Sequence, residues 1–203
     1  MTNKDKAFDL LSQDKYIGKY IIDYGLLPDV TKMESTFVAL CKSIVSQQLS
    51  TSAADTIYKR FKNSFIDYED PQRLCKLDIE DLRSVGLSTQ KSKYIMEVSR
   101  FWKQRDQLEE QLEQMEDEEI VKLLTQIKGV GEWTVHMLLI FHFHRDNILP
   151  LGDLVVRKGI LYFYDISPDS KYLLELCKEA TQHWAPFASY GSRYMWALKD
   201  KII

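Results

Sequence analysis

An aspartate that follows a proline and a glycine is the residue of this sequence best suited to chemistry. In "ILPLGDLVVRKGI", Pro150 and Gly152 favour a loop, and Asp153 stands directly before a predicted helix over Leu154–Tyr164. A carboxylate there could stabilise an oxocarbenium-like sugar as an N-glycosidic bond breaks, or orient the attacking water. Aspartate is also a preferred N-cap residue, so a purely structural role at the start of the helix stays open.

A second stretch with chemical potential is "IKGVGEWT", residues 127–134, which lies between two apolar runs. A turn between two helices needs a position that tolerates positive φ, which Gly129 supplies, and a position of close approach, which Gly131 supplies. The backbone N–H groups that open the second helix could bind a phosphate, and the carbonyls that end the first helix could hold a cation. The alternative is a plain helix corner without a ligand.

The elements that would position these residues are helices, because apolar residues recur at helical spacing along most of the chain. Residues 35–61 predict a helix, a polar corner and a second helix, and residues 81–101 repeat this plan around the turn "SVGLS". Residues 118–127 lead into the turn at Gly129, and residues 134–143 follow it. No sustained alternation of apolar and polar residues indicates a sheet, so the sequence predicts an all-α fold.

Composition narrows the class of protein. With 203 residues, of which 45% are hydrophobic, the chain can bury a core without disulfides. The three cysteines are odd in number and form no CxxC pair, so we expect reduced, mostly buried thiols in a cytosolic protein. No secretory signal and no apolar run of about 18 residues occurs, so we expect an intracellular protein that does not contact membranes. His136, His142 and His144 lack i, i+4 spacing, and we interpret them as ordinary histidines.

Charge is segregated along the chain. The net charge is −3, yet the run from Asp106 to Glu119 alone holds eight acidic residues, and removing them leaves +5 on the rest. We interpret that run as a solvated helix face or linker. The preceding stretch, Arg83 to Arg105, is strongly basic, with Glu97 as the one acid that opposes its six lysines and arginines. A local basic face of this kind is what binding to phosphates requires.

Five blocks, taken in order, resemble the helix-hairpin-helix DNA glycosylases of the 3-methyladenine DNA glycosylase II type. They are "FVALCKSIVSQQLSTSAADTIYKRF", "LRSVGLSTQKSKYI", "LLTQIKGVGEWTVHMLLIF", "DNILPLGDLVVRKG" and "WAPFASYGSRYMWAL". The resemblance implies an all-helical fold of two lobes with a central cleft, a helix-hairpin-helix motif at about residues 123–140, and one catalytic domain over residues 1–203. It also implies that Asp153 is the catalytic aspartate and that alkylated bases are removed from DNA.

The resemblance further assigns aromatic residues to a base pocket. Trp133 occupies the position where related glycosylases that nick the strand carry a lysine, so we expect no lyase chemistry. The electron-rich face of this indole suits stacking of a flipped, electron-poor alkylated purine. Trp196 and Tyr190 match further aromatic positions of the cleft. Ordinary core packing is the alternative for Trp133 and Tyr190.

Contacts with DNA are implied at two places. Gln48 resembles the residue that fills the gap left by the flipped base, and Gln47 or Ser50 could touch neighbouring bases, although some family members use an apolar wedge and a solvated helix end is the alternative. The N–H groups around Gly129 and Gly131 would bind a phosphate. A monovalent cation would bind at the hairpin, and no cofactor is required for catalysis. The expected ligands of this cation are the backbone carbonyls of Thr125, Ile127 and Val130.

The sequence therefore predicts a monofunctional glycosylase that flips alkylated purines out of damaged double-stranded DNA and hydrolyses the N-glycosidic bond, which initiates base excision repair. We expect a monomer in the bacterial nucleoid or, in a eukaryote, in the nucleus. Two alternatives stay open. One is a non-catalytic helix-hairpin-helix module that binds DNA or senses damage, in which Asp153 only caps a helix. The other is a helical protein unrelated to DNA. The preferred base, whether 3-methyladenine, 7-methylguanine, hypoxanthine or etheno-adenine, depends on pocket shape.

Overall fold

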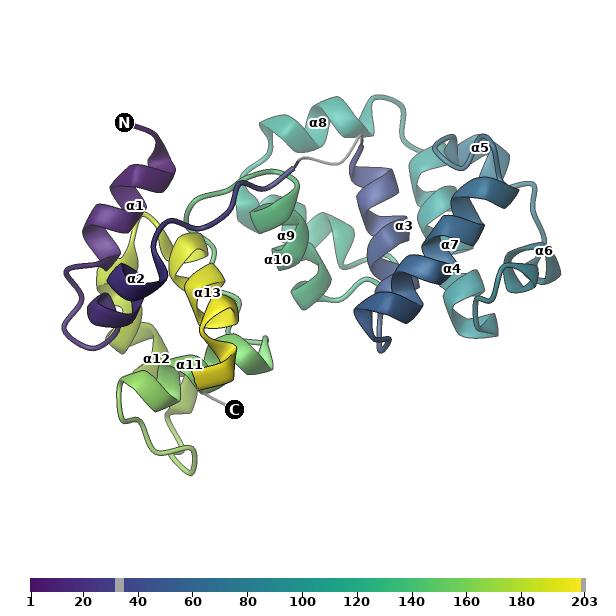
Figure 1. Cartoon of the computed structure of the whole chain (residues 1–203). Coiled ribbons are helices and arrows are strands. Elements are labelled where there is room, and N and C mark those ends of the chain that lie inside the picture. The colour runs from purple at the N-terminus through teal and green to yellow at the C-terminus, as the bar shows by residue number, and fades with distance from the viewer. Residues whose placement is uncertain (32–34, 202–203) are drawn as a thin grey trace. The chain divides into compact units, whose positions relative to one another are not determined.

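The computed structural model describes residues 1–31 and 35–201, and these residues form helices, turns and loops without a strand (Figure 1). The predicted all-α class is therefore confirmed. The chain divides into two compact units, which we call unit 1 (Met1–Thr31 with Leu139–Ile203) and unit 2 (Lys32–Leu138). None of the helices described has the length and apolar character needed to cross a lipid bilayer.

Unit 2 is built from consecutive helices joined by short turns. Helix α10 begins in this unit and ends in unit 1. The helices are α3 (Thr36–Ser46), α4 (Thr51–Ser64), α5 (Pro71–Leu74), α6 (Ile79–Ser84), α7 (Thr89–Lys103), α8 (Leu108–Gln114), α9 (Asp117–Leu124) and α10 (Glu132–Phe141).

The core of unit 2 centres on α3 and α7, which pack against each other, and α7 also packs against α5 and α6. Phe37, Leu40 and Ile44 of α3 are buried at the spacing that predicted this helix, and Ile95 of α7 is buried as well. Phe61 of α4 is also fully buried in this unit. The polar corner between α3 and α4 falls at residues 47–50, slightly before the Ser-Thr-Ser break that the sequence suggested, since Thr51 already belongs to α4.

Most acidic residues of the run are exposed on α8 and α9, as the sequence indicated, but Glu109 is an exception. The carboxylate of Glu109 accepts hydrogen bonds from the backbone N–H groups of Thr36 (2.9 Å) and Phe37 (3.0 Å) at the start of α3. It also accepts one from Nε1 of Trp102 at 2.9 Å. An acid at a helix N-terminus satisfies donors that the helix itself leaves unpaired. Glu109 therefore ties α8 to the first turn of α3.

Unit 1 combines both ends of the chain. Trp184 and Tyr194 are fully buried in its core, together with Ile17 and Ile21 from the N-terminal segment. Helix α11 packs against α12 and α13, and α1 also packs against α13. The helical elements are α1 (Asn3–Leu11), α2 (Gly18–Tyr24), α11 (Leu154–Phe163), α12 (Leu173–Thr181), η1 (Gln182–Trp184), α13 (Ala188–Ala197) and η2 (Lys199–Lys201).

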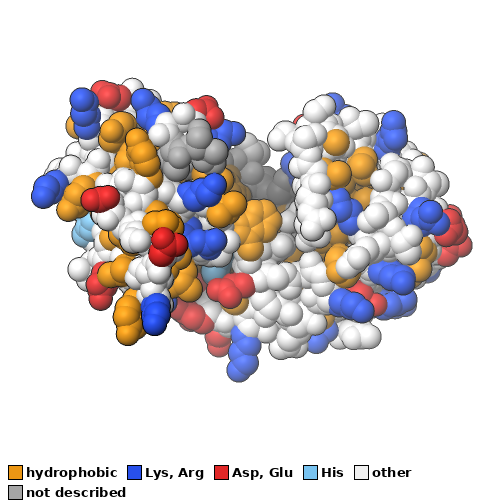
Figure 2. Space-filling model, turned by 90° about the horizontal axis from the view of Figure 1, so that it is seen from below, with side chains coloured by type: hydrophobic (Ala, Val, Ile, Leu, Met, Phe, Trp, Pro, Cys, Tyr) orange, Lys and Arg blue, Asp and Glu red, His pale blue; other side chains and the backbone are white. Residues whose placement is uncertain are grey.

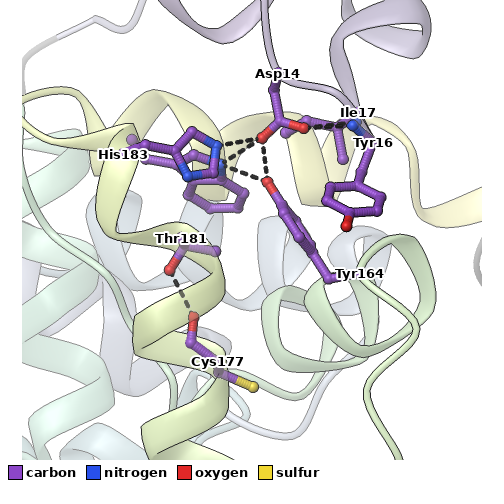
Figure 3. A network of polar contacts seen from close by, with 8 residues as sticks. Asp14, Tyr16, Ile17, Tyr164, Cys177, Thr181 and His183 are labelled. Carbon is purple, nitrogen blue, oxygen red and sulfur yellow. Dashed lines mark hydrogen bonds and ion pairs between the residues drawn. The ribbon is translucent and has the colours of Figure 1, made fainter.

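The buried carboxylate of Asp14 links the N-terminal segment of unit 1 to its C-terminal segment (Figure 3). Oδ1 of Asp14 accepts the N–H groups of Tyr16 (2.7 Å) and Ile17 (3.0 Å), while Oδ2 accepts the hydroxyl of Tyr164 and lies 2.5 Å from Nε2 of His183. Burial by itself would raise the pKa of Asp14, but hydrogen bonds from Tyr164, Ile17, His183 and Tyr16 outweigh it, and the pKa is lowered. The network therefore stabilises the ionised carboxylate in the folded protein.

Asp14→Asn should lower the free energy of unfolding by about 2 kcal/mol at neutral pH, because hydrogen bonds to a charged acceptor are lost from a buried site. A carboxyl whose folded pKa lies below its unfolded value contributes stability above the unfolded value, near 3.8 here, and loses it as the pH falls through the folded pKa. Urea denaturation at pH 7 and pH 3 should therefore show a difference between wild type and variant that shrinks at pH 3. Asp9→Asn, at an exposed position of α1, is the matched control. An equal difference at both pH values would contradict this role of the charge.

Candidate functional site

The predicted hairpin is present in unit 2, between α9, which ends at Leu124, and α10, which begins at Glu132. Its turn is closed by a hydrogen bond from the N–H of Val130 to the carbonyl of Ile127 at 3.0 Å. Gly129 adopts φ +97°, which confirms that this position needs the left-handed region. A similar turn joins α6 to α7, where Gly86 has φ +101°. Unit 2 thus contains two helix-turn-helix corners of the kind that the sequence indicated.

The two glycines of the hairpin have different surroundings. A Cβ atom added to Gly129 would lie 2.2 Å from Cγ of Tyr94, so the turn packs directly on this aromatic ring. A Cβ atom added to Gly131 would meet no atom within 4 Å. Gly129 therefore serves the fold, whereas the open space at Gly131 is what a backbone segment that receives a ligand would need.

A hollow of about 520 Å³ lies beside the hairpin and brings several predicted DNA-binding residues together. The amide Nε2 of Gln47 donates to the carbonyl of Gly129 at 3.2 Å, so the corner between α3 and α4 braces the hairpin directly. The side chains and backbone that line the hollow belong to three turns and the first part of α7. They are Gln47, Gln48, Ser88, Gln90, Lys91, Tyr94, Gly129, Val130 and Gly131.

The corner at residues 47–50 presents Gln48 to solvent. Gln48 is exposed and adopts φ +56°, a left-handed conformation that is uncommon for non-glycine residues. Ser50 is the N-cap of α4, and its hydroxyl accepts the N–H of Ala53 at 3.4 Å. Gln48 therefore has the exposure that a gap-filling residue needs, while the hydroxyl of Ser50 and the amide of Gln47 already have partners within the protein.

The sequence did not single out Tyr94, although this residue supports Gly129. Lys91 was part of the basic stretch, and its Nζ donates to the carbonyl of Val45 at 2.8 Å. Burial lowers the pKa of Lys91. The signal that could have found these residues is the second turn, "SVGLS", because α7 starts directly after it and both residues lie in the first two turns of α7.

Other residues of the basic stretch line a second hollow, of about 550 Å³, which shares Gln90 and Tyr94 with the first. Lys93, Arg100 and Lys128 supply positive charge there, and Glu97 pairs with Arg100 at 2.7 Å. Figure 2 shows several lysine and arginine side chains on one face of unit 2, with fewer acidic ones among them. Lys91, Lys93 and Arg100 of the basic stretch therefore line the two hollows.

The three expected cation ligands lie at the end of α9 and in the turn. Helix carbonyls in the last turn lack partners within the helix, and carbonyl oxygens suit a monovalent cation. The carbonyl of Ile127 accepts one hydrogen bond, from Val130, and retains a second lone pair. The carbonyls of Thr125, Ile127 and Val130 as ligands of such an ion stay a prediction. Within the described ranges, no cluster of three or more His, Cys, Asp or Glu residues could hold a metal through side chains.

Asp153 lies in unit 1 at the predicted place, as the N-cap of α11. Its Oδ1 accepts the N–H groups of Val155 and Val156, both at 2.9 Å. Nε1 of Trp196 also donates to Oδ1, at 3.0 Å. The side chain is buried, with 8% of the residue exposed. The capping role is therefore real, and the tryptophan donor from α13 is an additional contact that capping does not require.

Two aromatic residues predicted for the base pocket, Trp196 and Tyr190, lie on α13 but in different surroundings. Trp196 is half-buried, contacts Asp153, and packs against Phe141 with ring centroids 5.5 Å apart. Tyr190 lines a separate polar hollow with Asp146 and Arg193, and burial raises its pKa. The structure thus brings Trp196 to Asp153, while the assignment of Tyr190 to the base pocket stays a prediction.

Trp133 lies in the first turn of α10, in unit 2. It is 43% exposed, which argues against the alternative of ordinary core packing. The indole is thus partly exposed close to the hairpin, and its stacking with a base stays a prediction.

Comparisons with known proteins agree with the resemblance. The model of the HhH-GPD superfamily of base excision DNA repair proteins matches residues 41–183. DNA-3-methyladenine glycosylase 1 of Schizosaccharomyces pombe is 33% identical over 190 residues, which are 90% of this chain and 80% of that protein. YfjP of Bacillus subtilis, a provisionally named DNA-3-methyladenine glycosylase, is 33% identical over 80% of this chain, which spans 58% of that protein's length.

A solved structure shares the fold over nearly its whole length. The S. pombe 3-methyladenine DNA glycosylase in complex with abasic DNA superposes with a TM-score of 0.82 at 28% identity, covering 96% of this chain and 97% of that one. The match of the family model to most of the chain, together with the S. pombe relative, establishes that the chain belongs to the HhH-GPD superfamily of base excision DNA repair proteins.

Proposed function

We propose that this protein is a monofunctional DNA glycosylase that removes alkylated purines from double-stranded DNA. The observation that carries the proposal is the fixed carboxylate of Asp153, which follows the proline–glycine loop and belongs to a segment that the family model matches. The names of the relatives, 3-methyladenine glycosylases from yeast and bacteria, support the substrate class.

Asp153 would act on the sugar. As the N-glycosidic bond lengthens, positive charge develops on the sugar ring, and a carboxylate held by three donors needs no reorganisation to stabilise it. The same carboxylate could orient the water that attacks the sugar. The leaving group, an alkylated purine, already carries positive charge in its ring. It can therefore leave with little need for protonation by a general acid.

Trp133 would stack with the flipped base, and Gln48 would fill the gap that this base leaves in the duplex. The face of an exposed indole attracts a cationic purine, so Trp133 suits stacking of a base that has left the duplex. Gln48, exposed at its turn, would fill the space left in the duplex. Binding to the backbone would come from the N–H groups around Gly129 and Gly131. A monovalent cation at the neighbouring carbonyls would add positive charge there when bound.

We further propose that the protein works as a monomer on chromosomal DNA, in a nucleoid or nucleus. The S. pombe structure with abasic DNA supports DNA as the partner. A non-catalytic DNA-binding module is the second candidate, because Asp153 does cap α11. A duplex with one methylated purine distinguishes the two: a glycosylase makes the strand sensitive to alkali at the lesion, whereas a binding module leaves it intact.

Borohydride should trap no covalent complex between this protein and abasic or lesion-containing DNA. Lyases of this superfamily use a lysine at the position of Trp133, and an indole cannot form a Schiff base with the sugar. The measurement is denaturing electrophoresis after borohydride treatment, with a lysine-dependent lyase as positive control. A trapped adduct would show that another lysine acts, and the monofunctional assignment would fail.

A further inference from the structure

The contact between Trp196 and Asp153 crosses between two helices that the sequence separates by more than forty residues. Asp153 caps α11, Trp196 comes from the last turns of α13, and these helices pack against each other inside unit 1. Nε1 of Trp196 donates to Oδ1 of Asp153 at 3.0 Å. The indole has one donor, and this geometry directs it at the carboxylate.

The N-cap accounts for two of the hydrogen bonds that Oδ1 of Asp153 accepts. The N–H groups of Val155 and Val156 approach Oδ1 from the start of α11, a pair of contacts that any N-cap aspartate can make. Nε1 of Trp196 donates to the same oxygen from α13, outside the geometry of the cap. This donor from a different helix therefore narrows the positions that Oδ1 can take.

The tryptophan is itself held in place. Its ring packs against Phe141 with centroids 5.5 Å apart and an interplanar angle of 33°. Two aromatic rings in contact restrict the side-chain torsions of both. The indole ring therefore has a packing partner in the position from which its N–H donates to the carboxylate.

We propose that Trp196 is a positioning residue whose indole N–H holds the carboxylate of Asp153 in the orientation that excision needs. The inference rests on the proposed role of Asp153. It differs from the role expected from sequence, in which Trp196 supplied an aromatic face to the base. The two roles separate in experiment, because positioning acts through Asp153 and stacking does not.

The test is a double-mutant cycle with Trp196→Phe and Asp153→Asn, measured as the single-turnover rate of base release from a duplex with one methylated purine. Trp196→Phe keeps an aromatic ring against Phe141 and removes the donor. We expect a loss of about tenfold in wild type, the size associated with a hydrogen bond to a charged group. In the Asp153→Asn background the same change should cost less than about twofold.

The affinity for the lesion-containing duplex gives a second readout. Positioning predicts that Trp196→Phe leaves this affinity unchanged, whereas a stacking role predicts weaker binding in both backgrounds. Trp102→Phe is the matched control, since it removes an indole hydrogen bond to Glu109 of similar length, 2.9 Å, in unit 2. It should leave excision at the wild-type rate. Equal losses from Trp196→Phe with and without Asp153, or wild-type excision by Trp196→Phe, would overturn the inference.

If Trp196→Phe does not fold, the indole N–H signals of the ¹⁵N-labelled wild type provide the test. Asp153→Ala removes the acceptor, so the signal of Trp196, assigned by through-space contacts with Phe141, should move upfield. An unmoved signal would overturn the inference. Absence of base release by the wild type is a different result, which would overturn the proposed function and with it this role of Trp196.

Discussion

Asp153→Asn should fold normally and lose base excision by a factor of roughly 10² or more, because an electrostatic group directed at a developing cation is worth a few kcal/mol. Asparagine keeps an oxygen that can accept the N–H groups of Val155 and Val156, and it is as good an N-cap as aspartate. The fold should therefore survive while the negative charge disappears. This separation matters because the structure shows Asp153 in a capping role as well.

The measurement is the single-turnover rate of excision, together with thermal denaturation of both proteins. Asp70→Asn provides a matched control, because Asp70 is also an N-cap, of α5 in unit 2, and accepts the N–H of Gln72 at 2.8 Å. It should excise at the wild-type rate. Near-unchanged turnover by Asp153→Asn would mean that this aspartate only caps α11, and the catalytic assignment would fail.

Gly131→Val should weaken binding to DNA by roughly 10- to 100-fold, the value of one or two charge-assisted hydrogen bonds to a phosphate. A Cβ atom at Gly131 would meet no protein atom within 4 Å, so the valine side chain should disturb the fold little and occupy the space where we expect a phosphate. Valine is a poorer residue than glycine at a helix start, so we expect a cost to the fold of no more than about 1 kcal/mol. The weakening should be equal for damaged and undamaged duplexes, because phosphate contacts do not read bases.

Gly129→Ala is the informative comparison. Its Cβ atom would collide with Tyr94 at 2.2 Å, and φ +97° is unfavourable for alanine, so this variant should lose more than about 2 kcal/mol of folding stability. Fluorescence titrations with both duplexes and melting curves separate the two glycines. Wild-type affinity together with a wild-type melting temperature for Gly131→Val would show that the hairpin is only a helix corner and that DNA is held elsewhere.

Local features were predictable from sequence where a particular residue type is needed for a particular backbone conformation, such as glycine at positive φ. Gly129 was assigned positive φ because the turn between apolar runs demands it, and Asp153 was placed before a helix because of the loop at Pro150 and Gly152. The family and the all-α class were likewise confirmed, since ordered blocks and helical periodicity are properties of the sequence itself.

Contacts between distant segments were not predictable in the same way. Glu109 looked like one acid among many, and only the fold brings it to the N–H groups of Thr36 and Phe37. The burial of Asp14 against Tyr164 and His183 depends on the packing of both chain ends in unit 1. A single sequence carries no periodic signal for such pairs, because each depends on tertiary packing. The cleft expected between two lobes stays a prediction.

The most direct test of the proposed function is the release of free base from DNA treated with a methylating agent, measured by chromatography of the small-molecule fraction. The wild-type protein should release 3-methyladenine or another alkylated purine in amounts that match the abasic sites left in the duplex, and should release nothing from undamaged DNA. If the protein binds the methylated duplex and no free purine appears, then the chain is a DNA-binding module, and the catalytic role of Asp153 proposed here is wrong.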